Sequence, residues 1–336
     1  MANVVRSFRL LDLPGKSIKA VLQCSEVDDL ISFSLCSKKM LAIVKSLKLQ
    51  SKYFQLFSGN KFQILLLSGQ RDWIDILFCE NWQQNVSPSR MLKGDYVEAR
   101  YLYERNGRNI RQWRNAKFGG SDWISHFMTV FSCQSISRMS IESDHFLIDS
   151  LVNTVKDFNI VQLVIHNGVP KQYFLRIFRT FPCLENFVIS SMFDELSHNS
   201  ILLKNHANLY IRTDAKLSLD QVISVNSKVF DIRNFSIRDV NRFMKLWTAG
   251  SNRRLRYAEI RTVNGLRVAD KERVLKGVKH QAVPEETIRT FELPEHFLGT
   301  MKVKGGYDIF SANGRKATVA LNTRREITAF RMFIWL

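Results

Sequence analysis

The hydrophobic positions of the first fifty residues recur every three or four residues, which is the period of an amphipathic helix. They form three successive stripes: Ile18, Val21 and Leu22; Val27, Leu30, Ile31 and Leu35; and Met40, Ile43, Val44 and Leu47. Pro14 stands where a first helix would begin, because the N–H that proline lacks has no partner at a helix N-terminus. Ser25 and Asp28 have the spacing of a capping box, and Ser37 can cap the third helix. The pattern predicts three short helices over residues 8–50.

This helical module has more apolar surface than it can hide, since about forty residues cannot bury much of a core by themselves. One interpretation is a subdomain packed on the rest of the chain. The other is a docking module whose apolar face binds a partner. A DNA-reading helix-turn-helix would need basic and polar residues along its recognition helix. Lys38 and Lys39 are the only such residues at the start of the third helix, so DNA reading is disfavoured.

The middle of the chain contains short apolar runs of strand length that begin 21 to 26 residues apart. They cover residues 135–141, 160–166, 184–190, 207–211, 228–232 and 254–260. Helix-like segments lie between most of them, including one that Ser236 can cap. A strand and a helix recurring at this interval are typical of leucine-rich repeats, although the consensus Leu/Asn ladder is absent. We therefore expect a leucine-rich-repeat-like α/β region, with an ordinary open α/β sheet as the alternative.

β-Hairpins are predicted on both sides of this region. Residues 62–79 and 96–113 alternate in polarity around turn sequences, and Asn106-Gly107 is a strong hairpin signal. Asn313-Gly314 marks another turn, within residues 306–321, and the chain closes on an apolar strand over 327–336. The pattern thus places antiparallel pairs at the start and at the end of the α/β region.

Three shorter features complete the prediction. Ser121 can cap a helix over residues 122–133. Residues 49–59 form a candidate boundary segment that can also be helical. Gly305-Gly306 predicts a turn.

The predicted fold class is mixed, α+β or α/β, and four segments follow from it. They are residues 8–50, the helical module; 60–134, hairpins and a helix; 135–262, the α/β repeats; and 263–336, a C-terminal hairpin region.

Composition changes this picture only in one respect. The 336 residues are 45% hydrophobic, as in a globular protein, but the net charge of +18 raises nucleic acid as a partner. The nearest approach to a basic and aromatic stripe consists of Tyr96, Arg100, Tyr101, Tyr103, Arg105, Arg108, Arg111, Trp113 and Arg114. The same alternation fits a half-exposed hairpin. A nucleic-acid-binding protein with structural N-terminal helices is therefore the alternative function.

Enzyme chemistry has little support in the sequence. The chain has no phosphate-binding Gly-rich motif, no His-Glu-x-x-His and no Gly-x-Ser-x-Gly. Its five cysteines include no Cys-x-x-Cys pair, which fits buried thiols in a reduced compartment. We expect no cofactor, no metal, no catalytic residue and no membrane segment, and a location in the cytoplasm, the nucleus or both.

Two stretches resemble a known family. The first stretch, similar to an F-box, contains Leu13-Pro14, Ile18, Val21-Leu22, Asp29-Leu30, the sequence SLCSKKM and Ile43-Val44. Met40 departs from the tryptophan that many members carry there, as in the nematode branch. Residues 231–260, with DVNRFMKLW and GSNRRLRY, and the later VKGGYDI and FRMFIW resemble the type 2 F-box-associated domain of nematode F-box proteins.

The resemblance implies a non-catalytic substrate-recognition adaptor of an SCF-type (Skp–cullin–F-box) ubiquitin ligase. Its helical module would bind a Skp-family adaptor in a cullin complex, and its C-terminal region would bind a target protein, with acidic targets favoured by the basic charge. The implied adaptor-binding residues are Leu13, Pro14, Ile18, Val21, Leu22, Leu30, Leu35 and Ile43. No residue in the second half has chemistry specific enough to assign as substrate-binding.

Overall fold

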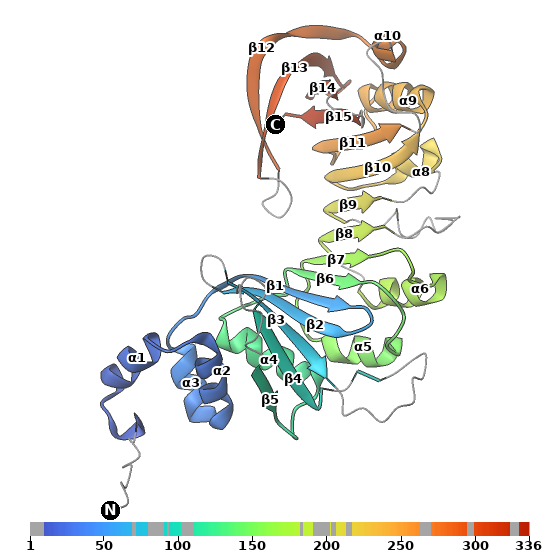
Figure 1. Ribbon diagram of the computed structural model, residues 1–336. Helices are drawn as coiled ribbons and strands as arrows, with labels where there is room; N and C mark the ends of the chain where they lie inside the picture. Colours follow the sequence, from blue (N-terminus) through green and yellow to red (C-terminus); the bar gives the residue numbers. More distant parts are fainter. Residues whose placement is uncertain are drawn as a thin grey trace, which may run out of the picture. The chain divides into compact units, whose positions relative to one another are not determined.

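The computed structural model forms two compact units (Figure 1). Unit 1 comprises residues 1–140 and 145–160, and unit 2 comprises residues 141–144 and 161–336. The residues that the structure describes are 10–68, 72–79, 91–92, 94–101, 111–181, 184–190, 202, 206–212, 217–262, 270–293, 299–322 and 329–335.

Unit 1 begins with the helical module, and the three predicted helices are confirmed. After a 3₁₀ turn, η1 (Leu10–Asp12), come α1 (Gly15–Gln23), α2 (Val27–Cys36) and α3 (Lys38–Lys45). The Ser37 hydroxyl accepts a hydrogen bond from the Met40 N–H at 3.2 Å, as a cap should.

The predicted capping box of α2 is wrong. Glu26 occupies the N-cap position and makes no side-chain cap bond. The Ser25 hydroxyl instead donates to the carbonyl of Val21 at 3.2 Å, so it serves the end of α1 rather than the start of α2. Pro14, predicted as a first helical residue, is the N-cap of α1.

A sheet in the order β6-β1-β2-β3-β4-β5 follows the module in unit 1. Its strands are β1 (Ser51–Ser58), β2 (Phe62–Ser68), β3 (Asp72–Cys79), β4 (Tyr96–Tyr101), β5 (Arg111–Arg114) and β6 (Arg138–Ile141). The β2–β3 and β4–β5 pairs are antiparallel, which confirms both predicted hairpins, although Asn106-Gly107 lies outside the described residues. The helical alternative for residues 49–59 is wrong, because Phe54, Leu56 and Ser58 alternate inward and pair with β2.

Two helices of unit 1, α4 (Gly120–Val130) and α5 (Ile148–Val155), pack against each other. The predicted Ser121 cap is wrong. Gly119 is the N-cap, and the Asp122 carboxylate accepts a hydrogen bond from its N–H at 2.8 Å. An acid in the first turn supplies the missing acceptor there, which is why a glycine suffices at the cap.

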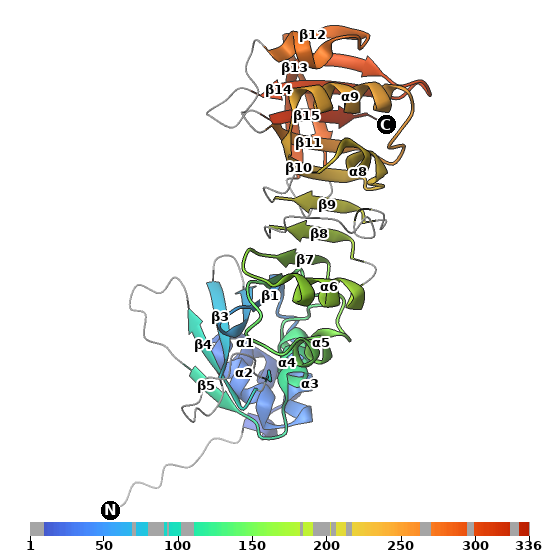
Figure 2. The ribbon, with the colours of Figure 1, turned by 90° about the vertical axis from the view of Figure 1, so that its right-hand side faces the viewer.

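Unit 2 is built on parallel strands in chain order, and five of the six predicted runs contain one, while the run 135–141 contains β6 of unit 1. They are β7 (Gln162–Ile165), β8 (Asn186–Ile189), β9 (Asn208–Ile211), β10 (Val229–Phe235) and β11 (Tyr257–Thr262). The helices α6 (Lys171–Thr180), α8 (Leu219–Ser224) and α9 (Ile237–Thr248) lie on one side of them (Figure 2). A short helix, α10 (Lys271–Leu275), follows β11. The leucine-rich-repeat-like character of this region stays a prediction.

An antiparallel part extends the sheet of unit 2 in the order β11-β15-β14-β13-β12. Its strands are β12 (His280–Glu292), β13 (Thr300–Phe310), β14 (Lys316–Asn322) and β15 (Ala329–Ile334). The closing strand is thus a core strand, and the β13–β14 hairpin around Asn313-Gly314 is confirmed. The predicted turn at Gly305-Gly306 is wrong, because both glycines lie within β13, opposite a break in the β12 register.

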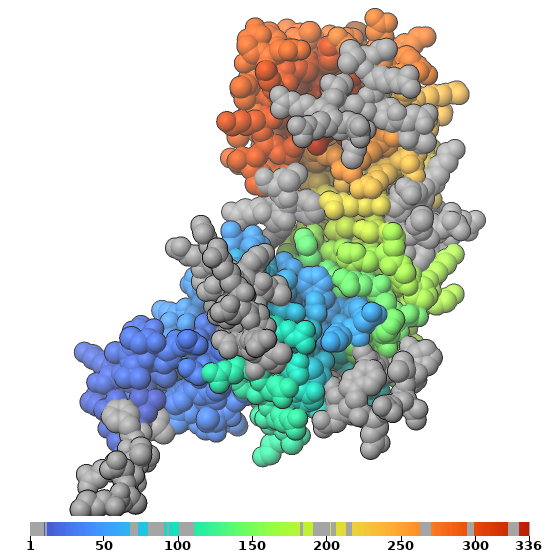
Figure 3. Space-filling model, in the orientation of Figure 1, coloured from blue at the N-terminus to red at the C-terminus, as the bar shows by residue number. Residues whose placement is uncertain are grey.

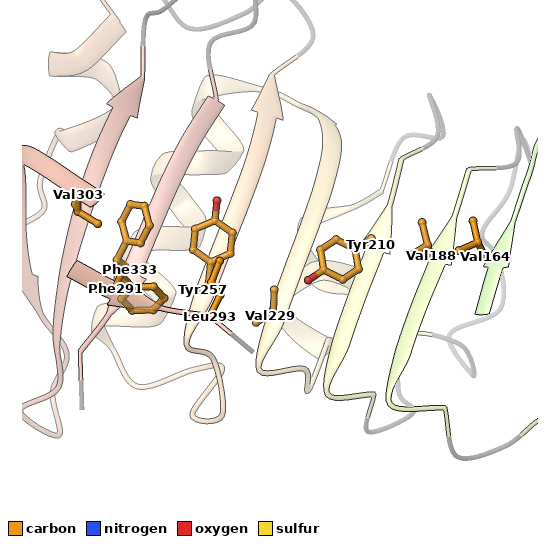
Figure 4. Close-up of a cluster of buried hydrophobic side chains, with 9 residues drawn as sticks. All are labelled: Val164, Val188, Tyr210, Val229, Tyr257, Phe291, Leu293, Val303 and Phe333. Carbon is orange, nitrogen blue, oxygen red and sulfur yellow. The ribbon is translucent and has the colours of Figure 1, made fainter. Parts of the chain in front are cut away.

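The two faces of the parallel sheet differ. On the helix side, the Phe230 ring of β10 meets Phe243 of α9 edge to face, with centroids 5.6 Å apart. On the opposite face an apolar row runs from Val164 on β7 to Phe333 on β15 (Figure 4). The side chains of β10 alternate between these faces, so Val229 and Asp231 share the face that carries no helix.

Candidate functional site

The helical module is attached to the rest of unit 1 through one side of α2. The Ser34 hydroxyl lies 2.8 Å from Nε2 of His126 on α4, and both side chains are buried. Two residues earlier, the Ser32 hydroxyl accepts a hydrogen bond from Nε1 of Trp113 on β5 at 2.8 Å. These contacts fix the orientation of α2, because each joins polar atoms that would be costly to bury alone.

The N-terminal turn of α2 adds a charged contact on the same side. Arg111 of β5 lies 3.3 Å from the buried carboxylate of Asp28 and 3.7 Å from the exposed carboxylate of Asp29. Ile31, between these contacts and Ser34, is fully buried. One side of α2 is therefore occupied within the chain, and a partner must use other surfaces of the module.

The predicted adaptor-binding residues divide into two groups. Ile18, Leu22 and Leu30 are buried, with 7%, 4% and 3% of their surface exposed. The other group is accessible in whole or in part and contains Leu13, Pro14, Val21, Leu35 and Ile43. Val21 is 44% exposed, although its side chain is entirely apolar.

Further half-buried apolar residues join this accessible surface and were not among the predicted set. They are Val27, Phe33, Leu41 and Leu47. Helical spacing marks Val27 and Leu47 as members of the same stripes, whereas Phe33 falls between the stripes and gave no signal. In the space-filling view the module, in dark blue, has a large open surface on the side shown (Figure 3). Such a surface suits hydrophobic docking rather than bond chemistry.

The described part of the basic and aromatic stretch is engaged within the chain. Trp113 is buried, and the guanidinium of Arg114 lies over the Tyr96 ring, 4.9 Å from its centroid. Arg100 lies 3.5 Å from Glu98. Tyr103, Arg105 and Arg108 lie outside the described residues. These contacts support the interpretation as a half-exposed hairpin more than a nucleic-acid stripe.

Metal chemistry and membrane insertion find no structural basis in the described ranges. No group of three or more His, Cys, Asp or Glu side chains there is placed to hold a metal ion. None of the helices in that part of the chain is long and apolar enough to span a bilayer.

Residues 231–260, which resemble the F-box-associated domain, contribute mainly to the core of unit 2. The apolar side chains of its DVNRFMKLW sequence, on α9, are buried against the sheet, with one exception. The buried ones are Val240, Phe243, Met244 and Trp247. The exception is Leu246, which is 40% exposed. The sequence pattern therefore identifies a fold and leaves the ligand-binding surface open.

Comparison with known families gives two matches. Residues 10–52 match the F-box domain, and residues 197–260 match the family described as F-box associated. No curated protein and no solved structure matches the chain. The first match contains the helical module, and the second contains β9, α8, β10, α9 and most of β11.

Proposed function

Since the chain is an F-box protein with an F-box-associated domain, we propose that it is the substrate-recognition adaptor of an SCF-type ubiquitin ligase. At the level of the family, these two domains indicate such an adaptor, and its members are as a rule non-catalytic. The helical module binds a Skp-family protein, and through it the cullin complex. Unit 2 binds the protein to be modified, in the cytoplasm, the nucleus or both.

The observation that carries the proposal is the two-sided helical module. Its α2 side is joined to unit 1 by the Ser34–His126 and Trp113–Ser32 contacts. Apolar residues remain accessible elsewhere on the module, and Val21 is 44% exposed. A partner that covers these residues would remove their apolar surface from water, which would stabilise the complex.

The burial of the implied adaptor-binding residues supports two different roles for them. Ile18, Leu22 and Leu30 form the core of the module and shape its surface. Direct contact falls to the accessible members, among which Pro14 and Val21 are exposed. A few such anchors dominate the energy of a typical interface.

The chain does no bond chemistry in this proposal. It holds a lysine of the target near a ubiquitin-loaded conjugating enzyme that other subunits supply. The effective concentration of that lysine at the enzyme is thereby raised. The two ends of the chain thus have separate tasks: attachment to the ligase and selection of the target.

The test is co-purification of a Skp-family adaptor with the full chain. Val21→Asp places a charge on the exposed apolar surface and is expected to lower adaptor binding on the order of tenfold. Asn153→Asp adds the same charge at an exposed position of α5 and is expected to leave binding unchanged. The proposal fails if the wild-type chain binds no Skp-family adaptor, or if both variants bind it equally well.

A further inference from the structure

A row of polar side chains crosses the face of unit 2 that carries no helix. Tyr210, Asp231, Glu259 and Arg331 are successive register partners on β9, β10, β11 and β15. Side chains two residues apart on a strand share a face. Arg212, Arg233 and Arg261 therefore lie on this same face, at the carboxyl ends of the three parallel strands.

Two buried carboxylates hold the arginines of this face in place. Asp231 is 4% exposed and Glu259 is 7% exposed. Arg212 and Arg261 lie 3.4 and 3.7 Å from Oδ2 of Asp231. Arg261 also donates to Glu259 at 2.7 Å, and Arg331 lies 3.2 Å from the other oxygen of Glu259. Arginines fixed in this way lose little further freedom when they bind a ligand.

The same arginines remain open to solvent. The side chains of Arg212, Arg261 and Arg331 are 39%, 26% and 28% exposed. Together with Arg233 they bring four positive charges against the two negative charges of Asp231 and Glu259, a surplus of two. Each guanidinium has five N–H donors in a planar fork, so donors remain beyond those that the carboxylates use. This surplus attracts anions.

Among the polar atoms of this face that have no hydrogen-bond partner in the described residues, two lie next to the paired arginines. Both arginines that reach Asp231 approach Oδ2, and its Oδ1 accepts no hydrogen bond. Nε of Arg233 likewise has no acceptor. The hydrogen-bonding capacity of this face is therefore not fully used within the chain.

We propose that this arginine row, defined as Arg212, Arg233, Arg261 and Arg331, binds an acidic segment of the target protein. The proposal rests on the function proposed above and names the class of target. Glutamate, aspartate or phosphoserine side chains pair with the guanidinium forks, which match planar or tetrahedral oxyanions. The carboxyl ends of parallel strands are a common place for ligands in open α/β sheets.

A peptide fits this face better than a nucleic acid does. Nucleic-acid binding without sequence preference uses exposed aromatic rings for stacking, but Tyr210 and Tyr257 on this face are each 3% exposed.

The test measures fluorescence anisotropy of labelled peptides in the presence of the full chain. The probes are labelled peptides of about ten residues: one rich in Asp and Glu, one with phosphoserine and one with Asn and Gln instead. Arg212→Gln with Arg233→Gln is expected to weaken binding of the acidic probes on the order of tenfold. The uncharged probe is expected not to bind.

Arg238→Gln with Arg242→Gln is the matched control. Both arginines are exposed on α9, on the opposite face, and their loss changes the net charge equally. Equal weakening by the two double variants would overturn the proposal, as would failure of both acidic probes to bind or tighter binding of single-stranded DNA. If the double variant unfolds, Arg212→Gln alone is compared with Arg238→Gln alone in the same binding assay. Arg212 is the most exposed of the three paired arginines. Adaptor binding, measured separately, fails only if the proposed function is wrong.

Discussion

The Ser34 hydroxyl of α2 and Nε2 of His126 in α4 lie 2.8 Å apart in the interior of unit 1. Phe118 and Phe127 surround the imidazole, with ring centroids 5.6 and 6.0 Å from its own. Burial in these surroundings lowers the pKa of His126 from 6.5 to about 4. The attachment of the helical module to unit 1 therefore depends on a neutral histidine.

The stability of unit 1 should accordingly fall in mild acid. Above pH 6.5 His126 is neutral in both the folded and the unfolded chain, so the contact is fully present. Between pH 6.5 and about 4 the unfolded chain binds a proton that the folded chain excludes, which favours unfolding. We expect His126 to contribute a loss of about 3 kcal/mol in the free energy of unfolding across this range.

Chemical denaturation of wild type and His126→Gln at several pH values measures this contribution. Glutamine cannot titrate, so the variant should be less stable at pH 7 and lose less stability between pH 6.5 and 4. Equal pH slopes for the two proteins would contradict the prediction.

Trp113→Phe should loosen the second attachment of α2. Phenylalanine keeps most of the buried ring but cannot donate to the Ser32 hydroxyl, which Nε1 of Trp113 reaches at 2.8 Å. The expected loss is about 1 kcal/mol in the free energy of unfolding. Trp73→Phe is the control. Trp73 stacks on Tyr53 with ring centroids 6.1 Å apart, and phenylalanine can keep such a ring contact. A smaller loss for Trp113→Phe than for the control would refute the role of this hydrogen bond.

The parallel strands β7, β8 and β9 were predictable because they are short and buried on both faces. Each run such as residues 162–165 or 186–189 consists largely of apolar side chains bounded by polar ones. What the pattern could not supply was the long-range pairing. Residues 49–59 are ambiguous alone, and only the partner strand β2 makes them a strand. Gly305 and Gly306 predict a turn because a pair of glycines is a local turn signal. Their place in β13, with positive φ, depends on pairing with β12, which the local sequence does not show.

The candidate site was predictable in part. Helical spacing identified the apolar stripes of the module, but spacing alone does not distinguish a buried stripe such as Ile18 and Leu22 from an exposed residue such as Val21. The polar contacts of Ser32 and Ser34 connect α2 with residues 81 and 92 positions away in the chain. The arginine row likewise depends on register across four strands, which the sequence does not specify.

Gly306→Ala should destabilise the antiparallel end of unit 2. Gly306 has a φ of +108°, and a Cβ added there would lie 2.6 Å from the carbonyl oxygen of Val319 on β14. Both the backbone strain and the clash oppose alanine, so we expect a loss of at least about 2 kcal/mol. Thermal unfolding measures it. Gly15→Ala, in α1 with open space around its Cβ position, should be neutral or slightly stabilising, and a similar loss for both variants would contradict the explanation.

Val21→Ser and Leu22→Ala should separate adaptor binding from the stability of the helical module. Leu22 is 4% exposed, so truncating it leaves a cavity that costs about 2 to 5 kcal/mol, measured by chemical denaturation. Val21 is 44% exposed, so its replacement should change stability by less than about 0.5 kcal/mol while it lowers affinity for a Skp-family adaptor in a titration. Of these two adjacent residues, Leu22 would then determine the stability of the module and Val21 its affinity for the adaptor, because only Val21 faces the partner. If Val21→Ser binds the adaptor as tightly as wild type, the accessible stripe of α1 is not the docking surface.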